Sequence, residues 1–126
     1  MAYKNIVLID DDTEDQEIFL SVVNDISSSA HCDCYTDASE ALKNLKALAG
    51  VPDVIFLDLN MPVMNGKQFL SAIKEEEGLK EIPVIMFTTS SDPATIKATK
   101  DLGAEDFITK PGSYNELVTI LKNLID

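Results

Sequence analysis

Fully apolar runs alternate with amphipathic segments along this chain. Val54–Leu57 and residues 84–87 contain only apolar side chains, which is typical of strands buried on both faces of a sheet. Between such runs, apolar residues recur every three or four positions, the spacing of helices that bury one face. The pattern predicts five strands, each followed by a helix. The predicted strands are residues 4–9, 31–36, 54–57, 84–87 and 106–109.

Capping residues set the expected helix boundaries. Asp37 and Glu40 have the spacing of a capping box, and the second helix should stop at Gly50. Asp92 precedes a proline suited to the first helical position, and Ser113 opens the last helix. The apolar positions expected on buried helix faces are Ile18, Phe19, Val22, Val23, Ile26, Ala41, Leu42, Leu45, Leu48, Phe69, Leu70, Ile73, Leu117, Ile120, Leu121 and Leu124.

A strand–helix unit repeated five times predicts an α/β fold with a mostly parallel sheet and helices on both faces. In such sheets, ligands bind at the carboxyl ends of the strands. A chain of 126 residues has room for one hydrophobic core. We therefore expect a single domain over residues 1–126, with no second, output domain.

The charge balance excludes some functions. The chain has 22 acidic and 10 basic residues, a formal net charge of −12. This argues against binding to nucleic acids or anionic membranes, and favours a divalent cation or a basic partner. No apolar run approaches the roughly 18 residues of a membrane span, and no signal peptide is visible. We expect a cytoplasmic protein.

Polar side chains follow four of the five predicted strands. Asp10 and Asp11 end the first, Asp58 the third, Thr88 the fourth and Lys110 the last. Because carboxylates brought together repel one another, they either take up protons or bind a cation. Aspartate oxygens without nearby histidine or cysteine suit a hard ion such as Mg²⁺.

This set of residues also suits phosphoryl transfer. That chemistry needs a nucleophile, charge neutralisation and positioning. Asp58 stands alone at the end of the central strand and is the natural nucleophile, since aspartyl phosphates are known intermediates. Lys110 would supply a positive charge and Thr88 a hydrogen bond.

Simpler interpretations exist for several of these residues. Asp12 fits the general preference for negative charge at a helix N-terminus. Lys110, taken alone, would be an ordinary solvated lysine before a turn. The hydroxyl group of Thr88 has alternatives in Thr89, Ser90 and Ser91.

The segment His31-Cys32-Asp33-Cys34 suggests a metal or redox site at first sight. On a strand, however, the two cysteines point to one face and His31 and Asp33 to the other, so the four side chains do not converge. The pair is also too close in sequence for an unstrained disulfide. We interpret Cys32 and Cys34 as small, half-buried hydrophobic residues.

Four segments together carry a family resemblance. They are residues 9–12 (IDDD), 57–62 (LDLNMP) with Gly66, 87–89 (FTT) and 110–111 (KP). Their order and spacing resemble the receiver domain of bacterial response regulators, of the stand-alone kind that regulates chemotaxis. The resemblance covers essentially the whole chain. It implies a flavodoxin-like, doubly wound sheet of five parallel strands in the order 2-1-3-4-5, with five helices.

The resemblance also implies roles for the polar residues. Asp58 would accept a phosphoryl group from a phosphohistidine. Asp11 and Asp58 would bind Mg²⁺ directly, together with the main-chain carbonyl of Asn60, while Asp10 would contribute through a bound water. Lys110 would pair with the phosphate.

The family's conformational switch would use Thr88 and an aromatic residue on the last strand. Thr88 would move toward the phosphate, and the matching aromatic residue is Phe107, where many members have tyrosine. The family usually has a cis bond before the proline that matches Pro111. Thr89 stands where small residues are common, and Gly112 replaces a bulky apolar residue, so the following loop is expected to differ in shape.

The function implied is a single-domain response regulator. It would be phosphorylated by a sensor histidine kinase or phosphotransfer protein and would act on a downstream protein by docking or by passing the phosphoryl group on. It would not be a turnover enzyme, and it would be a monomer or weak homodimer. Its expected contact surface spans the last two helices and the strand between them, including Lys97, Lys100, Phe107 and Asn115.

Two alternatives remain at this point. An aspartyl-nucleophile phosphatase of the haloacid dehalogenase type needs a second acid two residues after the nucleophile, but Asn60 cannot release a proton. A degenerate receiver that binds partners without phosphate is opposed by the complete set of Asp10, Asp11, Asp58, Thr88 and Lys110.

Overall fold

The computed structural model describes residues 3–47 and 51–125. Five parallel strands form one sheet in the order β2-β1-β3-β4-β5, as expected. Apart from small shifts at their ends, they match the predicted segments, and β4 runs one residue further, through Thr88. The strands are β1 (Asn5–Ile9), β2 (His31–Tyr35), β3 (Val54–Leu57), β4 (Val84–Thr88) and β5 (Asp106–Thr109).

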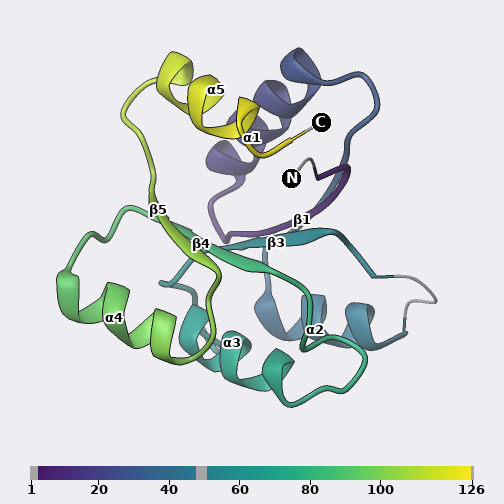
Figure 1. Ribbon diagram of the computed structural model, residues 1–126, viewed down its shortest axis with the longest axis vertical. Helices are drawn as coiled ribbons and strands as arrows, with labels where there is room; N and C mark the ends of the chain where they lie inside the picture. Colours follow the sequence, from purple (N-terminus) through teal and green to yellow (C-terminus); the bar gives the residue numbers. More distant parts are fainter. Residues whose placement is uncertain (1–2, 48–50, 126) are drawn as a thin grey trace.

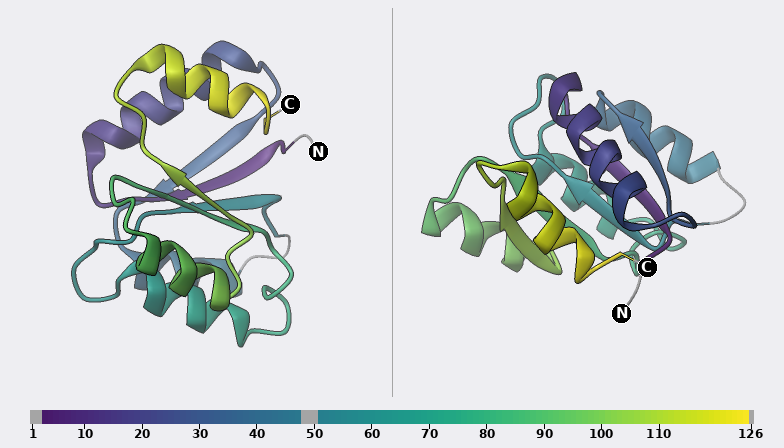
Figure 2. Two further views of the ribbon diagram at one scale, coloured as in Figure 1. Left: turned by 60° about the vertical axis from the view of Figure 1, so that its left-hand side comes forward. Right: turned by 90° about the horizontal axis from the view of Figure 1, so that it is seen from above.

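Helices cover both faces of the sheet. Two helices lie on one face and three on the other, which gives the three layers seen in Figure 1 and from other directions in Figure 2. No helix among the described residues is long and apolar enough to cross a membrane. The first face carries α1 (Thr13–Ile26) and α5 (Tyr114–Lys122), and the second carries α2 (Ala38–Ala47), α3 (Gly66–Lys74) and α4 (Pro93–Asp101).

Alternate residues of each central strand enter one of two hydrophobic cores. Along β3, Val54 and Phe56 pack in the cluster beneath α1 and α5, while Ile55 and Leu57 pack on the side of α2 and α3. All four are fully buried. Because side chains alternate along a strand, a run that is apolar throughout is what a sheet covered on both faces requires.

The predicted caps form at three helices. Asp92 accepts the N–H of Thr95, and Ser113 accepts the N–H of Glu116. Asp37 accepts the N–H groups of residues 39 and 40 at the start of α2. The expected end of α2 at Gly50, including Leu48 on its apolar face, lies outside the described residues.

The cysteines on β2 behave as the alternation predicts. Cys32 and Cys34 have free thiols and pack against the core beneath α1 and α5. The hydrogen bond that the Cys32 thiol donates to Cys34 and burial raise the pKa of Cys32, so this thiol stays protonated. His31 and Asp33 lie on the exposed face, with His31 Nε2 2.9 Å from Asp33 Oδ1. The structure supports the hydrophobic interpretation of the cysteines.

The first and last described residues lie side by side. Tyr3 and Ile125 form a parallel β-bridge, and the N–H of Tyr3 donates to the carbonyl oxygen of Leu124 at 2.9 Å. The segments before β1 and after α5 therefore lie near one another, as Figure 1 shows.

Gly66 fixes the start of α3 against the end of β3. A Cβ atom at this position would lie 2.4 Å from the carbonyl oxygen of Asp58 and 2.9 Å from the Cα of Leu59. The N–H of Gly66 also donates to the Leu59 carbonyl oxygen at 2.9 Å. Only glycine lets the two backbone segments approach this closely.

We expect Gly66→Ala to lower the free energy of unfolding by about 1–3 kcal/mol, since backbone atoms must move to admit the methyl group. Urea denaturation of the purified variant measures this. Gly78→Ala is the matched control, because a Cβ there meets nothing within 4 Å. Equal loss of stability in both variants would contradict the argument.

Candidate functional site

Main-chain pairing brings the predicted site residues together at the edge of the sheet that is formed by the carboxyl ends of its strands. The N–H of Asp58 donates to the carbonyl oxygen of Ile9 at 2.9 Å, just past the end of β3. The N–H of Lys110 donates to the carbonyl oxygen of Thr88 at 2.7 Å, just past β5. These bonds extend the ladders by one step, so the side chains that follow the apolar runs are fixed in register.

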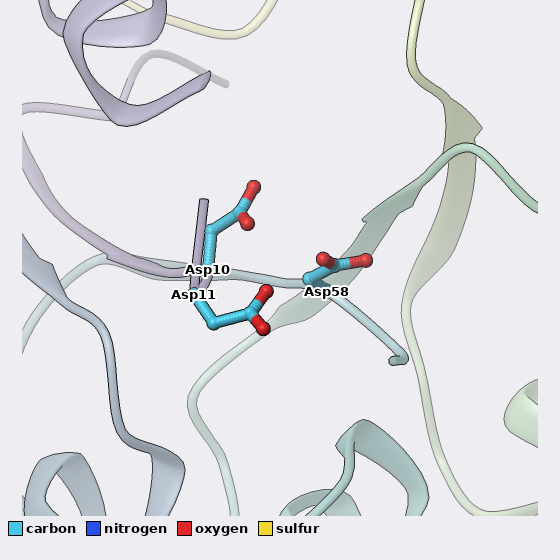
Figure 3. Close-up of side chains that lie close together, drawn as sticks. All are labelled: Asp10, Asp11 and Asp58. Atoms are coloured by element: carbon cyan, nitrogen blue, oxygen red, sulfur yellow. The ribbon is translucent and has the colours of Figure 1, made fainter. Parts of the chain in front are cut away.

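Three carboxylates meet at this edge. One carboxylate oxygen from each of Asp10, Asp11 and Asp58 lies within 4.8 Å of the other two. Figure 3 shows the three side chains gathered at this place. Asp10 is 1% exposed and Asp58 7%, whereas Asp11 is exposed. Ligands that are all carboxylate oxygens suit a hard divalent cation, so this cluster fits a Mg²⁺ site.

Lys110 provides the positive charge that the cluster needs. Its Nζ lies 2.7 Å from Asp10 Oδ2, 2.8 Å from Asp15 Oδ2 and 3.6 Å from Asp58 Oδ2. It also lies 5.7 Å from the centre of the Phe87 ring. Burial alone would lower the pKa of Lys110, but hydrogen bonds to Asp10 and Asp15 outweigh it and raise the pKa. The ammonium group therefore stays charged.

Burial dominates the ionisation of Asp10. It raises the pKa of this carboxyl group to about 6, with a further contribution from the negative charge of Asp58. The hydrogen bonds from Lys110 and from the Asp12 N–H act in the opposite direction and are weaker. Because burial disfavours the charged form of Asp10, a cation bound beside its ionised carboxylate would stabilise that form.

The two oxygens of Asp58 have different surroundings. Oδ1 accepts the N–H of Leu59 at 2.8 Å, and Oδ2 is the oxygen that faces Lys110. The hydrogen bond to the backbone fixes the orientation of the carboxylate. Oδ2 is left beside a cation, next to the other two carboxylates.

Thr88 and Phe107 lie on the same face of the sheet. Met86 pairs with Phe107 and Thr88 with Thr109 in the β4–β5 register, so Thr88 and Phe107 are diagonal neighbours. Thr88 is fully buried, and its Oγ1 accepts the N–H of Ser90 at a long 3.5 Å. Phe107 is half-buried and packs against the core on the side of α2–α4.

Asn60 lies in the loop after Asp58. Its side chain is exposed, and its Nδ2 lies 3.5 Å from Ser90 Oγ. The side chain is therefore not part of the carboxylate cluster, and only its main-chain carbonyl is expected to act at the site.

The loop after Lys110 departs from expectation in one respect. The described residues contain no cis peptide bond, so the bond before Pro111 is trans and the expectation of a cis bond is wrong. Trans is the intrinsically favoured form, by about 0.5–1 kcal/mol.

Beside this loop, a hollow of about 180 Å³ lies between α1 and α5. Gly112 lines it without filling it, since a Cβ there would meet nothing within 4 Å.

The sequence reasoning missed Asp15 and Gln16. Asp15 reaches Lys110 from the first turn of α1. Gln16 donates from Nε2 to the carbonyl oxygens of Asp10 (2.8 Å) and Tyr35 (3.0 Å), which fixes the ends of β1 and β2 to the helix. The sequence did carry one signal for these two residues: they are polar and lie in the first turn of the helix that begins directly after the aspartates of the site.

Comparisons with known proteins agree with this geometry. The family model for the response regulator receiver domain matches residues 6–122. The chain therefore belongs to the response regulator receiver family, the class of two-component signalling domains that its fold and aspartate cluster indicate.

Individual response regulators are similar to this chain over most of its length. It is 34% identical over 109 residues to the two-component response regulator ORR6 of Oryza sativa subsp. japonica, covering 85% of this chain and 62% of that protein. It superposes on the phosphorylated cyanobacterial phytochrome response regulator RcpA with a TM-score of 0.87 and 31% identity, covering 97% and 91% of the two chains. The Mn²⁺-bound response regulator Rcp1 gives a TM-score of 0.82 at 25% identity, with 94% and 90% covered.

The matched proteins differ in length. The chain spans about a quarter of the bacterial and archaeal protein-glutamate methylesterases that it matches at 40–42% identity. The similarity to those enzymes thus concerns the receiver portion that they share with this chain.

We expect Asp10→Asn to raise the free energy of unfolding at pH 7 by about 1–3 kcal/mol in metal-free buffer. In the wild type, the folded-state pKa of Asp10 is about 6, above its ordinary value of 3.8. The unfolded chain therefore binds fewer protons between these values, and stability falls as pH rises through this window. Urea denaturation at pH 4 and pH 7 measures the effect, which should vanish at the lower pH.

Asp53→Asn is the contrasting control for this experiment. Hydrogen bonds from the N–H groups of Asn5 and Lys4 lower the pKa of Asp53. Its loss should therefore reduce stability at pH 7, the opposite sign. Destabilisation by both variants at pH 7 would contradict the interpretation of Asp10.

Proposed function

We propose that Asp58 accepts a phosphoryl group from the phosphohistidine of a sensor histidine kinase or phosphotransfer protein, in a Mg²⁺-dependent reaction. The observation that carries this proposal is the placement of one Asp58 oxygen beside both a carboxylate cluster and the Lys110 ammonium. Membership of the receiver family supports the same function.

The transfer itself asks little covalent chemistry of the protein. A carboxylate oxygen of Asp58 forms a bond to phosphorus while the phosphorus–nitrogen bond of the phosphohistidine breaks. The bonding electrons go to the imidazole, which takes up a proton. Lys110 attracts the phosphoryl oxygens, and the hydrogen bond from Leu59 keeps the Asp58 carboxylate oriented for attack.

Asp11, Asp58 and the main-chain carbonyl of Asn60 would hold Mg²⁺, with Asp10 contributing through water. When bound, the ion supplies the neutralisation of charge that phosphoryl transfer requires. The carboxylate cluster supports this assignment, and so does the Mn²⁺-bound state named for the similar response regulator Rcp1.

We further propose that Thr88 and Phe107 relay phosphorylation to a surface on α4, β5 and α5. Phosphorylation would shift a population between two positions of these side chains. The resulting surface, with Lys97, Lys100 and Asn115, would dock a downstream protein, or the phosphoryl group would pass onward. The proposed unit is a single receiver domain over residues 1–126, monomeric or weakly dimeric and cytoplasmic, without contacts to nucleic acid or membrane.

This function is that of a switch which assists its own phosphorylation and dephosphorylation, and not that of a turnover enzyme. A phosphatase of the dehalogenase type would need an acid at position 60, where this chain has asparagine. Turnover of a small phosphoester that is abolished by Asp58→Ala would favour the phosphatase instead.

We expect Asp58→Asn to abolish labelling by a phosphorylated histidine kinase, because an amide cannot attack phosphorus as a carboxylate does. Stoichiometry is measured with radiolabelled phosphate. Asp12→Asn is the control: Asp12 caps α1, and asparagine caps as well. Equal labelling of Asp58→Asn and wild type would refute the assignment of Asp58.

We expect Thr88→Ala to bind beryllofluoride, which mimics a phosphoryl group on a carboxylate, but to lose the response at Phe107. In the wild type, Mg²⁺-dependent amide shifts around Asp58 should spread to Phe107 and α5. In the variant, the shifts should stay near Asp58 and Lys110. NMR titration with and without Mg²⁺ measures both, and spreading shifts in the variant would contradict the relay.

A further inference from the structure

An ion pair links the proposed phosphoacceptor site to α1. Lys110 Nζ lies 2.8 Å from Asp15 Oδ2 and 2.7 Å from Asp10 Oδ2, but 3.6 Å from Asp58 Oδ2. An ammonium group has three hydrogens to donate. Two hydrogen bonds go to carboxylates other than that of Asp58. Asp58 thus has the weakest hold on the lysine of the three.

The backbone of Asp15 is held in place by the cap of α1. Asp12 Oδ1 accepts the N–H groups of Glu14 and Asp15, at 3.0 and 3.2 Å. The Asp15 side chain is 35% exposed, so it is not needed to fill the core. The interaction that its carboxylate makes is the ion pair with Lys110. Asp15 and Lys110 both line the hollow between α1 and α5.

The charges around Lys110 are already unbalanced. Asp10, Asp15 and Asp58 all lie within 4 Å of one ammonium group. Asp15 is not in the carboxylate cluster that could hold a cation, so a bound metal ion would not be coordinated by it. A phosphoryl group brings further negative charge and must compete with Asp15 for the lysine.

Building on the proposed phosphorylation of Asp58, we propose that Asp15 is a positioning residue that draws Lys110 toward α1 and so lowers the affinity of the Asp58 site for a phosphoryl group. The residue acts through Lys110 and does not touch the reacting atoms. It would set how readily the site captures phosphate, independently of how well it holds a cation.

The test compares wild type with Asp15→Asn, which keeps the shape of the side chain and removes its charge. We expect the dissociation constant for beryllofluoride, at saturating Mg²⁺, to fall at least about threefold. The initial rate of phosphorylation by acetyl phosphate should rise similarly. In metal-free buffer, the NMR signal of the Lys110 ammonium group should shift, because one of its two close partners has changed.

Two control variants separate this role from a general effect of charge or structure. Glu14→Gln removes an equal charge from the same exposed turn of α1 and should leave beryllofluoride affinity unchanged. Asp15→Glu retains the charge and should restore affinity toward the wild-type value. The affinity for Mg²⁺ alone, measured by the same titration, should be similar in all four proteins.

The outcomes distinguish the two proposals. If the wild type binds beryllofluoride and Asp15→Asn binds it equally or more weakly, the role of Asp15 is refuted while phosphorylation of Asp58 stands. An equal gain in Glu14→Gln would also refute it, since nonspecific charge would then explain the effect. If the wild type takes up neither beryllofluoride nor phosphate, the proposed function fails, and the role of Asp15 fails with it.

Discussion

The ammonium group of Lys110 is shared by the carboxylates of Asp10, Asp15 and Asp58, where the strands of an otherwise apolar sheet end. Much of the molecule serves to hold these groups there. Asp10 and Asp58 are almost entirely buried, so their charges repel with little screening by solvent. Lys110 offsets the repulsion between these two carboxylates. It follows β5, which is separated from β3 by β4 in the sheet. The ladders of main-chain hydrogen bonds fix the backbone of Lys110 in register, so its flexible side chain extends from a fixed point beside the carboxylates.

Several features of the fold follow from the need to keep this edge both rigid and charged. Gly66 allows the first turn of α3 to pack directly against the main chain of Asp58 and Leu59. Gln16 connects α1 to the ends of β1 and β2 through two carbonyl oxygens. Thr88 and Phe107, on the opposite face, connect the same edge to the core beneath α4. The site therefore has structural connections to both layers of helices.

The strands, and the meeting of Asp10, Asp11, Asp58 and Lys110 at one place, could be predicted because strand ends can be identified from local sequence. An apolar run that ends in aspartate identifies a buried strand and the side chain at its end, as for Asp58 and Asp10. The parallel topology then brings these ends together. The strand order came from the resemblance to a family, since hydrophobic patterns do not specify which strands are neighbours.

The residues that escaped prediction depend on tertiary geometry. Asp15 looks like any acidic residue in a first helical turn, and only the direction of α1 relative to β5 brings it to Lys110. The bond before Pro111 is trans, and the prediction of a cis bond was wrong because it rested on the family resemblance alone, with no physical argument from this sequence. The hollow beside Gly112 likewise requires the packing of α1 against α5 to be known.

The bridge between Tyr3 and Ile125 has a practical consequence for protein engineering. Tyr3 precedes β1 and Ile125 follows α5, so both lie at the edge of the sheet opposite to the aspartates. A short linker could connect Ile125 to Tyr3, and new termini could then be opened in a surface loop to give a circular permutant. Fusion partners or surface tethers joined next to Tyr3 or Ile125 would be attached at the end of the sheet opposite to the aspartates.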